Sequence, residues 1–226
     1  MITIDFHTHT IASRDSLTSP EQLIALCRRK GLDRVVITDH NTIAGALAAQ
    51  KLDPERVIVG EEIMTSGGEI LAAFVTEEVA PGLSPQETIR RLRDQGAFIS
   101  VSHPFDRTRS GSWRLEHLLE IASLVDAIEI FNARCLYAEF NRRARTFARE
   151  HGLPGTVGSD AHAPSELGAA CLVLEPFDGP DEMRIAIRKA RVQARLSPFW
   201  VHFFSVYAKY RKRLAGGKNL DISPQA

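Results

Sequence analysis

Cysteine is scarce in this chain. Its three cysteines, Cys27, Cys135 and Cys171, lie far apart and form no C-x-x-C pair. This pattern argues against a disulfide framework and against a zinc knuckle, and it predicts buried, reduced thiols in a cytoplasmic protein. Net charge is also absent, because 28 basic and 28 acidic residues cancel. A balanced surface gives no reason to expect nonspecific nucleic-acid binding, so any anionic ligand needs a local site.

Long hydrophobic runs are missing as well. No apolar stretch reaches membrane-spanning length, and the N-terminus enters an apolar strand without the basic and apolar regions of an export signal. We therefore expect neither a transmembrane span nor secretion. With 226 residues and 44% hydrophobic content, the chain is long enough for one globular domain with a sizeable core.

Short apolar runs alternate with helix-like segments along most of the chain. The expected strands are 2–6, 34–39, 56–60, 69–75, 97–103, 126–131, 154–160 and 171–175. Two intervening helices carry clear signals: Ser19 and Ser84 as N-caps, each followed by proline, with Gly31 and Gly96 at the ends. Repeated βα units predict an α/β fold, a parallel TIM-like barrel, complete or distorted, in preference to a doubly wound sheet.

The last part of the chain differs in composition. We divide the chain into a domain over 1–195 and a C-terminal helical tail over 196–226, which is aromatic first and basic after. The favoured interpretation is a helix whose aromatic residues dock on the barrel. The alternative is a helix that lies on a membrane surface.

Polar residues with metal-binding chemistry fall where the expected strands stop. They are His7 and His9, Asp39 and His40, Glu61 and Glu62, His103, Glu129 and Asn132, and Asp160 and His162. Residues two apart on a strand share a face, and the ends of parallel strands meet at one mouth, so these groups are expected to converge. The alternative is that these are unrelated, solvent-exposed loop residues that form no common site.

The donor set itself indicates the kind of ion. Mixed nitrogen and oxygen ligands suit Zn²⁺, Mn²⁺ or Fe²⁺ better than Mg²⁺ or Ca²⁺. So many acids in one cavity require compensating charge, which favours two or three divalent ions over one. Asp5 shares the face of His7 and His9, where it would either orient an imidazole or serve as a buried structural carboxylate.

At this point the sequence resembles the PHP (polymerase and histidinol phosphatase) superfamily. The matching motifs are D-F-H-T-H-T at 5–10, T-D-H at 38–40, G-E-E at 60–62, S-H-P at 102–104 and G-S-D-A-H at 158–162. The resemblance implies a distorted (β/α)7 barrel with two or three ions at its C-terminal mouth. It implies one ion on His7, His9, Glu62 and Asp160, a second shared by Glu62 and His103, and a third on Asp15, His40 and His162.

One position departs from the family pattern. Members with three ions usually carry a histidine shortly after the bridging glutamate, and here Glu69 is the comparable residue. If Glu69 is a ligand, the second site is harder and more anionic; if it is not, that site is weak or empty. The stretches IEIFNAR and GSDAHAPSELG resemble the branch with a PHP-associated C-terminal segment, mostly predicted phosphoesterases, which implies that Asn132 and Arg134 border the site.

The expected reaction is hydrolysis of a phosphomonoester by a metal-activated hydroxide, with a small phosphorylated molecule, including a nucleotide or short oligonucleotide, as substrate. Arg107, Arg109 and Arg134, with Asn132, are candidates for binding the substrate, although arginine is also common in solvated loops. We expect Asp39, His40 and Asp160 to be catalytic, with Asp39 or a metal-free histidine protonating the leaving oxygen.

Two other functions fit parts of the pattern. An amidohydrolase acting on a C–N or lactone bond also begins with H-x-H on a barrel strand, but its common form bridges the metals with a carbamylated lysine. This chain has no lysine between Lys51 and Lys189.

A non-catalytic metal-binding regulatory module is disfavoured by the near-complete ligand set. No G-x-S-x-G elbow is present, which argues against a serine nucleophile.

Overall fold

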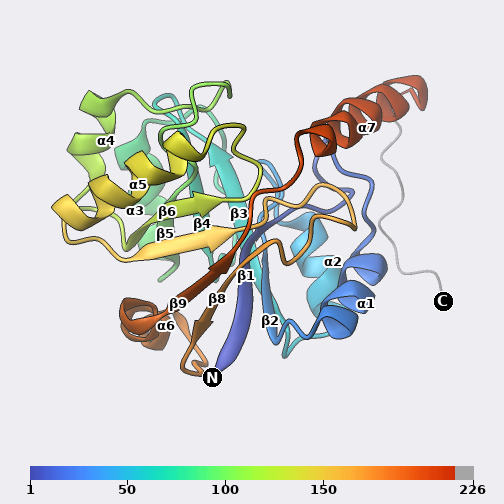
Figure 1. The fold of residues 1–226 in the computed structure, drawn as a ribbon, viewed down its shortest axis with the longest axis horizontal. Helices are drawn as coiled ribbons and strands as arrows, with labels where there is room; N and C mark the ends of the chain where they lie inside the picture. Colours follow the sequence, from blue (N-terminus) through green and yellow to red (C-terminus); the bar gives the residue numbers. More distant parts are fainter. Residues whose placement is uncertain (217–226) are drawn as a thin grey trace.

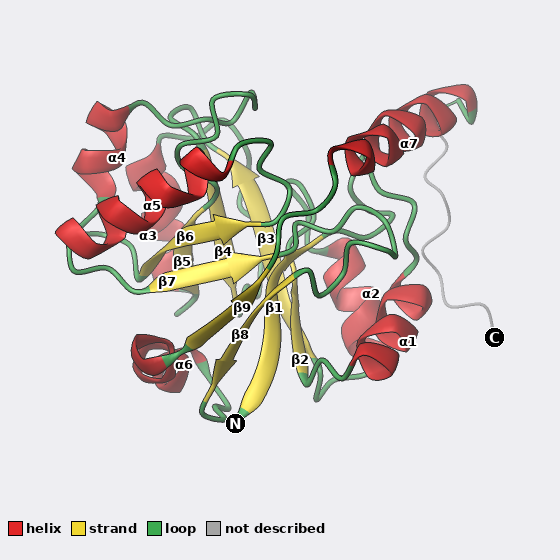
Figure 2. Ribbon diagram, viewed as in Figure 1, coloured by secondary structure: helices red, strands yellow, loops and turns green. Residues whose placement is uncertain are grey.

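The computed structural model describes residues 1–216. Figure 1 shows a strongly curved sheet with helices packed against its outside, and Figure 2 shows the same arrangement by secondary structure. The strands are β1 (Ile2–Thr8), β2 (Arg34–Ile37), β3 (Val57–Met64), β4 (Glu69–Ala73), β5 (Phe98–Val101), β6 (Ala127–Asn132), β7 (Gly155–Gly158), β8 (Ala170–Leu174) and β9 (Arg191–Ala194). The helices are α1 (Pro20–Lys30), α2 (Ala44–Leu52), α3 (Pro85–Asp94), α4 (Leu115–Ile121), α5 (Ala138–Glu150), α6 (Pro180–Ala186) and α7 (His202–Leu214), with 3-10 turns at Ile187–Lys189 and Phe199–Val201.

The sheet has the order β7-β6-β5-β4-β3-β2-β1-β8-β9, and its β7 end returns to β1 to form a nearly closed barrel, while β8 and β9 continue the sheet beyond β1. The closure runs between β1 and the segment that follows β7. The Asp160 amide donates to the His7 carbonyl at 2.7 Å, and the His9 amide donates to the Ala161 carbonyl at 2.9 Å. Gly158 allows this approach, because a Cβ there would lie 2.2 Å from the His7 Cβ. The distorted barrel expected from the sequence is confirmed.

Strand direction corrects one part of the expectation. The sheet is not a uniform run of parallel βα units, because β4 is antiparallel to both β3 and β5, and β8 is antiparallel to β1 and β9. A short turn, not a helix, joins β3 to β4. The first residue of β4, Glu69, therefore lies opposite Met64 at the end of β3, so an antiparallel strand brings its beginning to the mouth.

The two helices with clear sequence signals form as expected. In α1 the Ser19 hydroxyl accepts from the Gln22 amide in a capping box, and Gly31 ends the helix in the left-handed region at φ 69°. In α3 the Ser84 side chain accepts from the Glu87 amide, and Gly96 follows the helix at φ 74°. Both helices start with proline, whose missing amide hydrogen costs nothing in the first turn.

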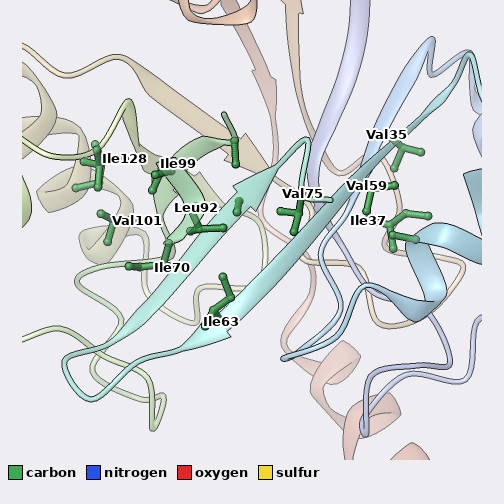
Figure 3. Close-up of a cluster of buried hydrophobic side chains, with 14 of the residues drawn as sticks. Val35, Ile37, Val59, Ile63, Ile70, Val75, Leu92, Ile99, Val101 and Ile128 are labelled. Atoms are coloured by element: carbon green, nitrogen blue, oxygen red, sulfur yellow. The ribbon is translucent and has the colours of Figure 1, made fainter. Parts of the chain in front are cut away.

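Two hydrophobic layers lie on the two sides of the sheet. The outer layer joins strand residues such as Val35, Ile63 and Ile99 to the helices, for example through Leu92 of α3 (Figure 3). The inner layer fills the barrel below the mouth and extends to β8 and α6; it includes Phe6, Val36, Ile58, Leu71, Phe98, Leu172 and Met183. Because these large side chains fill the barrel, its interior is a packed core and not a channel.

Successive side chains of β3 alternate between the two faces of the sheet, so the neighbouring acids Glu61 and Glu62 point to opposite sides. Ile58 belongs to the inner layer, whereas Val59 and Ile63 belong to the outer layer. Glu62 shares the inner face with Ile58, and Glu61 shares the outer face, where its carboxylate accepts from the Val79 amide at 3.1 Å. Glu62 lies within the strand and not at its end, because β3 continues to Met64.

The aromatic tail does not dock as the favoured interpretation expected. The side of α7 and its preceding turn that faces the barrel carries Val201, Ser205 and Ala208, which are buried. The large aromatic side chains, including Phe203 and Tyr210, are instead exposed. The docking expectation was therefore wrong, because small residues allow the helix to approach the barrel and the aromatics face outward. The division at residue 196 stays a prediction, and the part of the tail beyond 216 lies outside the described residues.

Within residues 1–216, none of the helices combines the length and the apolar character needed to cross a bilayer.

Glu61 gives a test of the outer layer through pH. Burial raises the pKa of the Glu61 carboxyl from 4.5 to about 7, so the folded chain holds this proton more tightly than the unfolded chain does. Its contribution to stability is present below the unfolded pKa and is lost as pH rises through the folded pKa. We expect Glu61→Gln, which still accepts from Val79, to raise the free energy of unfolding by about 1–2 kcal/mol at about pH 8 and to change it little at about pH 5.

Denaturant unfolding at the two pH values measures this difference. Glu77→Gln, at an exposed position two residues before Val79, is the matched control and should leave the pH dependence unchanged. An equal effect of Glu61→Gln at both pH values would show that burial of this charge is not what limits stability.

Candidate metal centre

Nine side chains expected to bind metal gather at one mouth of the barrel. They come from β1, β3 and β4 and from the loops that follow β1, β2, β5 and β7: His7, His9, Asp15, His40, Glu62, Glu69, His103, Asp160 and His162. All nine residues are buried apart from His40, which is partly exposed. The convergence expected from strand ends is therefore present in the structure.

The first group surrounds the two histidines of β1. His7 Nε2 and His9 Nε2 lie 3.0 Å apart, so the i and i+2 side chains do point to one place. Glu62 Oε2 lies 3.4 Å from His7 Nε2 and 3.5 Å from His9 Nε2. Asp160 Oδ1 lies 3.5 Å and 3.2 Å from the same two nitrogens. Two nitrogens and two oxygens thus face a common centre.

The second group shares Glu62 with the first. His103 Nε2 lies 3.2 Å from Glu62 Oε1 and 3.4 Å from Glu69 Oε2. His40 Nδ1 lies 3.0 Å from Glu62 Oε2 and 3.9 Å from Glu69 Oε1. Glu69 packs against Gly111, where a Cβ would lie 2.2 Å from the carboxylate oxygen. The structure thus brings Glu69 beside His103 and His40, within the second group.

The third group is built on Asp15, which lies in the loop after β1. Asp15 Oδ1 lies 3.3 Å from His162 Nε2 and 3.5 Å from His40 Nε2. His40 therefore presents one ring nitrogen to the second group and the other to the third. From the tail, Lys209 Nζ lies 3.3 Å from the second oxygen of Asp15, so α7 reaches the edge of this group.

These distances fit the ligand shells of metal ions. Ligands about 2.0–2.2 Å from one ion lie roughly 3.0–3.5 Å from one another in tetrahedral or octahedral arrangements. Three buried carboxylate oxygens, Asp15 Oδ1, Glu62 Oε2 and Asp160 Oδ1, have no hydrogen-bond donor, and each faces two or three imidazole nitrogens. A buried carboxylate oxygen without a donor is costly, and a cation among these atoms would satisfy all three.

The charges of the site act strongly on one another. Burial disfavours the charged form of His7, but Glu62, Asp160 and Glu129 outweigh it and raise its pKa well above the usual value. Burial and the charges of His162 and His40 lower the pKa of His9. Burial and the nearby Glu62 charge raise the pKa of Glu69. Burial disfavours ionisation of Glu62 and Asp160 as well, but His7 and His40 beside Glu62 and Arg109 beside Asp160 outweigh it and lower both pKa values. These buried carboxylates therefore depend on nearby positive charge, which bound cations would supply.

Three imidazoles are held so that Nε2 faces the centre. His7 Nδ1 donates to Glu129 Oε1 at 3.0 Å, and His162 Nδ1 donates to the Asp160 carbonyl at 2.8 Å. His9 Nδ1 lies 3.0 Å from Ser13 Oγ, and the Ser13 hydroxyl donates to Asp39 at 2.5 Å. A protonated Nδ1 leaves the lone pair on Nε2, which is the form that binds a metal.

The sequence did not identify Glu129 and Ser13 as orienting residues. Glu129 was noted at a strand end without a role, and here it accepts from His7, from the His103 amide at 2.8 Å and from Asn132 at 3.2 Å. Nothing in the sequence distinguishes Ser13 from other loop serines. Ser13 reaches His9 within the loop after β1, and Glu129 reaches His7 across the barrel from β6.

Two aspartates lie away from the cluster. Asp39, expected to be catalytic, is fully buried, and its oxygens accept from the amides and hydroxyls of Thr10 and Ser13 at 2.5–3.2 Å. Asp5 accepts from Ser159, Gly168 and the His7 amide, which is the structural alternative considered for it. Burial raises the pKa of Asp5 to about 6.

The candidate substrate-binding residues separate into different positions. Arg109 Nη1 lies 2.6 Å from Asp160 Oδ2, and its Nη2 donates to Asn132 at 3.3 Å, so both are beside the cluster. Arg134 is buried, 3.1 Å from Glu166, and donates to Ser205 of α7 at 2.9 Å. Arg107 is exposed on the loop after β5. Of the three arginines, only Arg109 is brought against the metal-binding residues.

Backbone strain is found at two of the ligands. His103 has φ 20° and Asp160 has φ 53°, values that side chains other than glycine rarely adopt. Strained residues of this kind gather at functional sites, where the surrounding contacts hold them in place.

Comparison with known proteins identifies two family models and a related protein. A PHP domain model matches residues 5–78, and a PHP-associated model matches residues 138–192. An uncharacterised protein of Methanocaldococcus jannaschii, MJ0417, is 34% identical over 185 residues, which cover 80% of this chain and 74% of that protein.

Solved structures share the fold at low identity. PsfC from Pseudomonas syringae has a TM-score of 0.67 at 16% identity and covers 94% of this chain and 98% of its own. A candidate metal-dependent phosphoesterase from Bifidobacterium adolescentis has a TM-score of 0.60 at 19% identity, covering 71% and 88%. An amidohydrolase from Chromobacterium violaceum, with bound sulfate and no metal, has a TM-score of 0.60 at 14% identity, covering 89% and 96%. The motifs, the barrel and the two matched models together show that this chain belongs to the PHP family, with a PHP-associated C-terminal segment.

Proposed function

We propose that this chain is a metal-dependent hydrolase that cleaves phosphomonoesters through a centre of two or three divalent ions, Zn²⁺, Mn²⁺ or Fe²⁺. The observation that carries the proposal is the set of buried carboxylate oxygens of Asp15, Glu62 and Asp160, which lack donors and face imidazole nitrogens at 3.0–3.5 Å. The substrate that we expect is a small phosphorylated molecule, nucleotides and short oligonucleotides included.

The contacts support a division of ligands among the ions. One ion would be held by His7, His9, Glu62 and Asp160. A second would be held by Glu62, Glu69 and His103, with His40 Nδ1 nearby, and a third by Asp15, His40 and His162. When bound, such ions polarise a phosphoryl oxygen and lower the pKa of the attacking water. In this scheme His40 and Asp160 act as ligands.

The protein supplies orientation and charge around the ions. Asp39 holds Ser13, and Ser13 holds the ring of His9, so we propose a positioning role for Asp39 instead of proton transfer. Arg109 lies against Asp160 with its side chain 21% exposed, so its guanidinium is the cation best placed to bind phosphoryl oxygens. Asn132 donates to both Asp160 and Glu129 and keeps these carboxylates in place.

The amidohydrolase alternative has less support. Its common bridging group is a carbamylated lysine, whereas here the carboxylate of Glu62 lies between the first two groups. Lys209 lies at the rim, where it pairs with Asp15 at 3.3 Å. We therefore favour a phosphoester substrate.

Loss of a ligand tests the proposal directly. We expect His7→Ala and Asp160→Ala each to reduce phosphate release from a panel of phosphomonoesters by at least about a hundredfold, because an ion contributes several kcal/mol to the transition state. Bound metal, measured by elemental analysis, should fall with activity while circular dichroism stays unchanged. His117→Ala, a histidine of α4 outside the centre, is the control. Undiminished phosphate release by either ligand variant would mean that chemistry occurs elsewhere.

Glu129 tests the orienting role. Glu129→Gln keeps an acceptor for His7 but removes the negative charge that strengthens the imidazole as a ligand, so metal affinity should fall by about 10–100-fold. Competition with a chelating dye measures that affinity. Glu61→Gln, the same change at a buried glutamate on the other side of β3, should leave it unaltered. Equal affinities for the two variants would contradict the orienting role.

Glu69 tests the second group. Glu69→His replaces an oxygen donor by a nitrogen donor and removes a charge beside Glu62, so the ratio of zinc to manganese bound from an equimolar mixture should rise. Glu69→Gln should lower the number of ions retained per chain. Elemental analysis after dialysis gives both results. An unchanged metal count in Glu69→Gln would remove Glu69 from the ligand set.

A further inference from the structure

The C-terminal helix exposes a stripe of large apolar side chains on the side that faces away from the barrel. Figure 1 shows α7 at the upper right edge of the molecule. The stripe consists of Phe199, Trp200, Phe203, Phe204, Val206, Tyr207, Tyr210 and Leu214, which are 39% to 73% exposed. Residues three, four and seven apart share a helix face, so these side chains form one continuous strip about 20 Å long.

The opposite side of the helix fixes its orientation. Val201, Ser205 and Ala208 are buried toward the barrel, and Ser205 accepts from Arg134 at 2.9 Å. Lys212 donates to the carbonyls of Ile11 and Ser13 in the loop after β1. These contacts all lie on one face of α7. They fix the rotation of the helix, so the apolar stripe on the opposite face points away from the barrel.

The charged residues of the segment that carries the stripe have one sign. Residues 196–216 contain four basic and no acidic residues. Arg211 borders one side of the stripe, and Arg213 borders the other, where it lines a groove of about 600 Å³ together with Arg14, Lys209 and Lys212. Lys209 and Lys212 also bind Asp15 and the carbonyls of Ile11 and Ser13 on the inner side, so Arg211, Arg213 and Arg14 form the basic margins. An apolar strip between basic margins is complementary to a surface that is apolar inside and anionic at its edge.

We propose that α7 docks this protein on an anionic lipid surface, with the stripe inserted at the level of the headgroups and the basic margins against lipid phosphates. Interfacial helices have this distribution of aromatic and basic residues, and anionic leaflets attract basic segments. A second copy of the chain fits less well, because two stripes face to face would bring two sets of basic margins together. Single-stranded nucleic acid fits less well, because stacking requires separate aromatic platforms, whereas this stripe continues through Val206 and Leu214.

Vesicle sedimentation of the full chain tests the proposal. We expect binding to vesicles of phosphatidylcholine mixed with phosphatidylglycerol and at least about tenfold weaker binding to phosphatidylcholine alone. The substitutions Phe203→Ser, Val206→Ser and Tyr210→Ser together should reduce binding at least about tenfold without unfolding the chain, since all three side chains are exposed. The matched control replaces exposed apolar residues on other helices, with Leu47→Ser, Leu119→Ser and Ile185→Ser, and should bind as the wild type does.

Two further measurements distinguish insertion from electrostatic attraction. Brominated lipid should quench the emission of Trp200, and Trp200→Phe should abolish the quenching, because the other tryptophan, Trp113, is buried. Arg211→Glu with Arg213→Glu should remove the preference for anionic vesicles.

Several outcomes would overturn the proposal. Failure of the wild type to sediment with anionic vesicles is one, and equal binding by the stripe variant is another. Sedimentation velocity that shows a lipid-free dimer lost in the stripe variant would assign the stripe to a second copy. Equally strong, stripe-dependent binding of a single-stranded oligonucleotide would assign it to nucleic acid.

Discussion

The buried carboxylate of Glu62 is the group on which the arrangement of the mouth depends. One oxygen accepts from Ser102 at 2.7 Å and lies beside His103, whereas the other has no donor and faces His7, His9 and His40. A carboxylate buried in this way requires positive charge, and the imidazoles supply it only when protonated, a state in which they do not bind metal. Cations satisfy the carboxylate and leave the imidazoles neutral. Because Glu62 faces two ligand groups, occupation of one changes the electrostatic potential at the other.

The groups behind the ligands explain why the acids at neighbouring strand ends do different things. Asp39 and Glu129 both follow the same pattern of an acid near the end of an apolar run, but their oxygens are used differently. The oxygens of Asp39 accept hydrogen bonds from Thr10 and Ser13. The oxygens of Glu129 accept hydrogen bonds from His7, the His103 amide and Asn132. Each fixes an imidazole without facing the centre itself. Rigid support of this kind matters because a ligand misplaced by an ångström loses much of its affinity.

The sequence predicted the features that depend on local pattern. The H-x-H pair converges because alternate residues of β1 share a face, and the helices that start at Pro20 and Pro85 form because their caps are local. The direction of β4 is not local: an apolar run of five residues looks the same whichever way it runs, so the parallel expectation failed there. The orientation of the aromatic tail is not local either. Its composition can be read from the sequence, but the face that it turns toward the barrel depends on where Ser205 and Ala208 make contact.

The inner side of the tail helix makes the polar contacts that connect it to the metal-binding centre. Lys209 pairs with Asp15 and Lys212 binds the carbonyls of the loop that carries Asp15, whereas the large apolar side chains of the same helix remain outside. Most surface helices have the reverse arrangement, with the apolar face buried and the charged face in solvent. Burial of large side chains is the usual source of tertiary stability, so a helix that withholds them is attached weakly for its length. A surface that binds the outer face of α7 would therefore also act on the position of Asp15, and with it on the third ligand group.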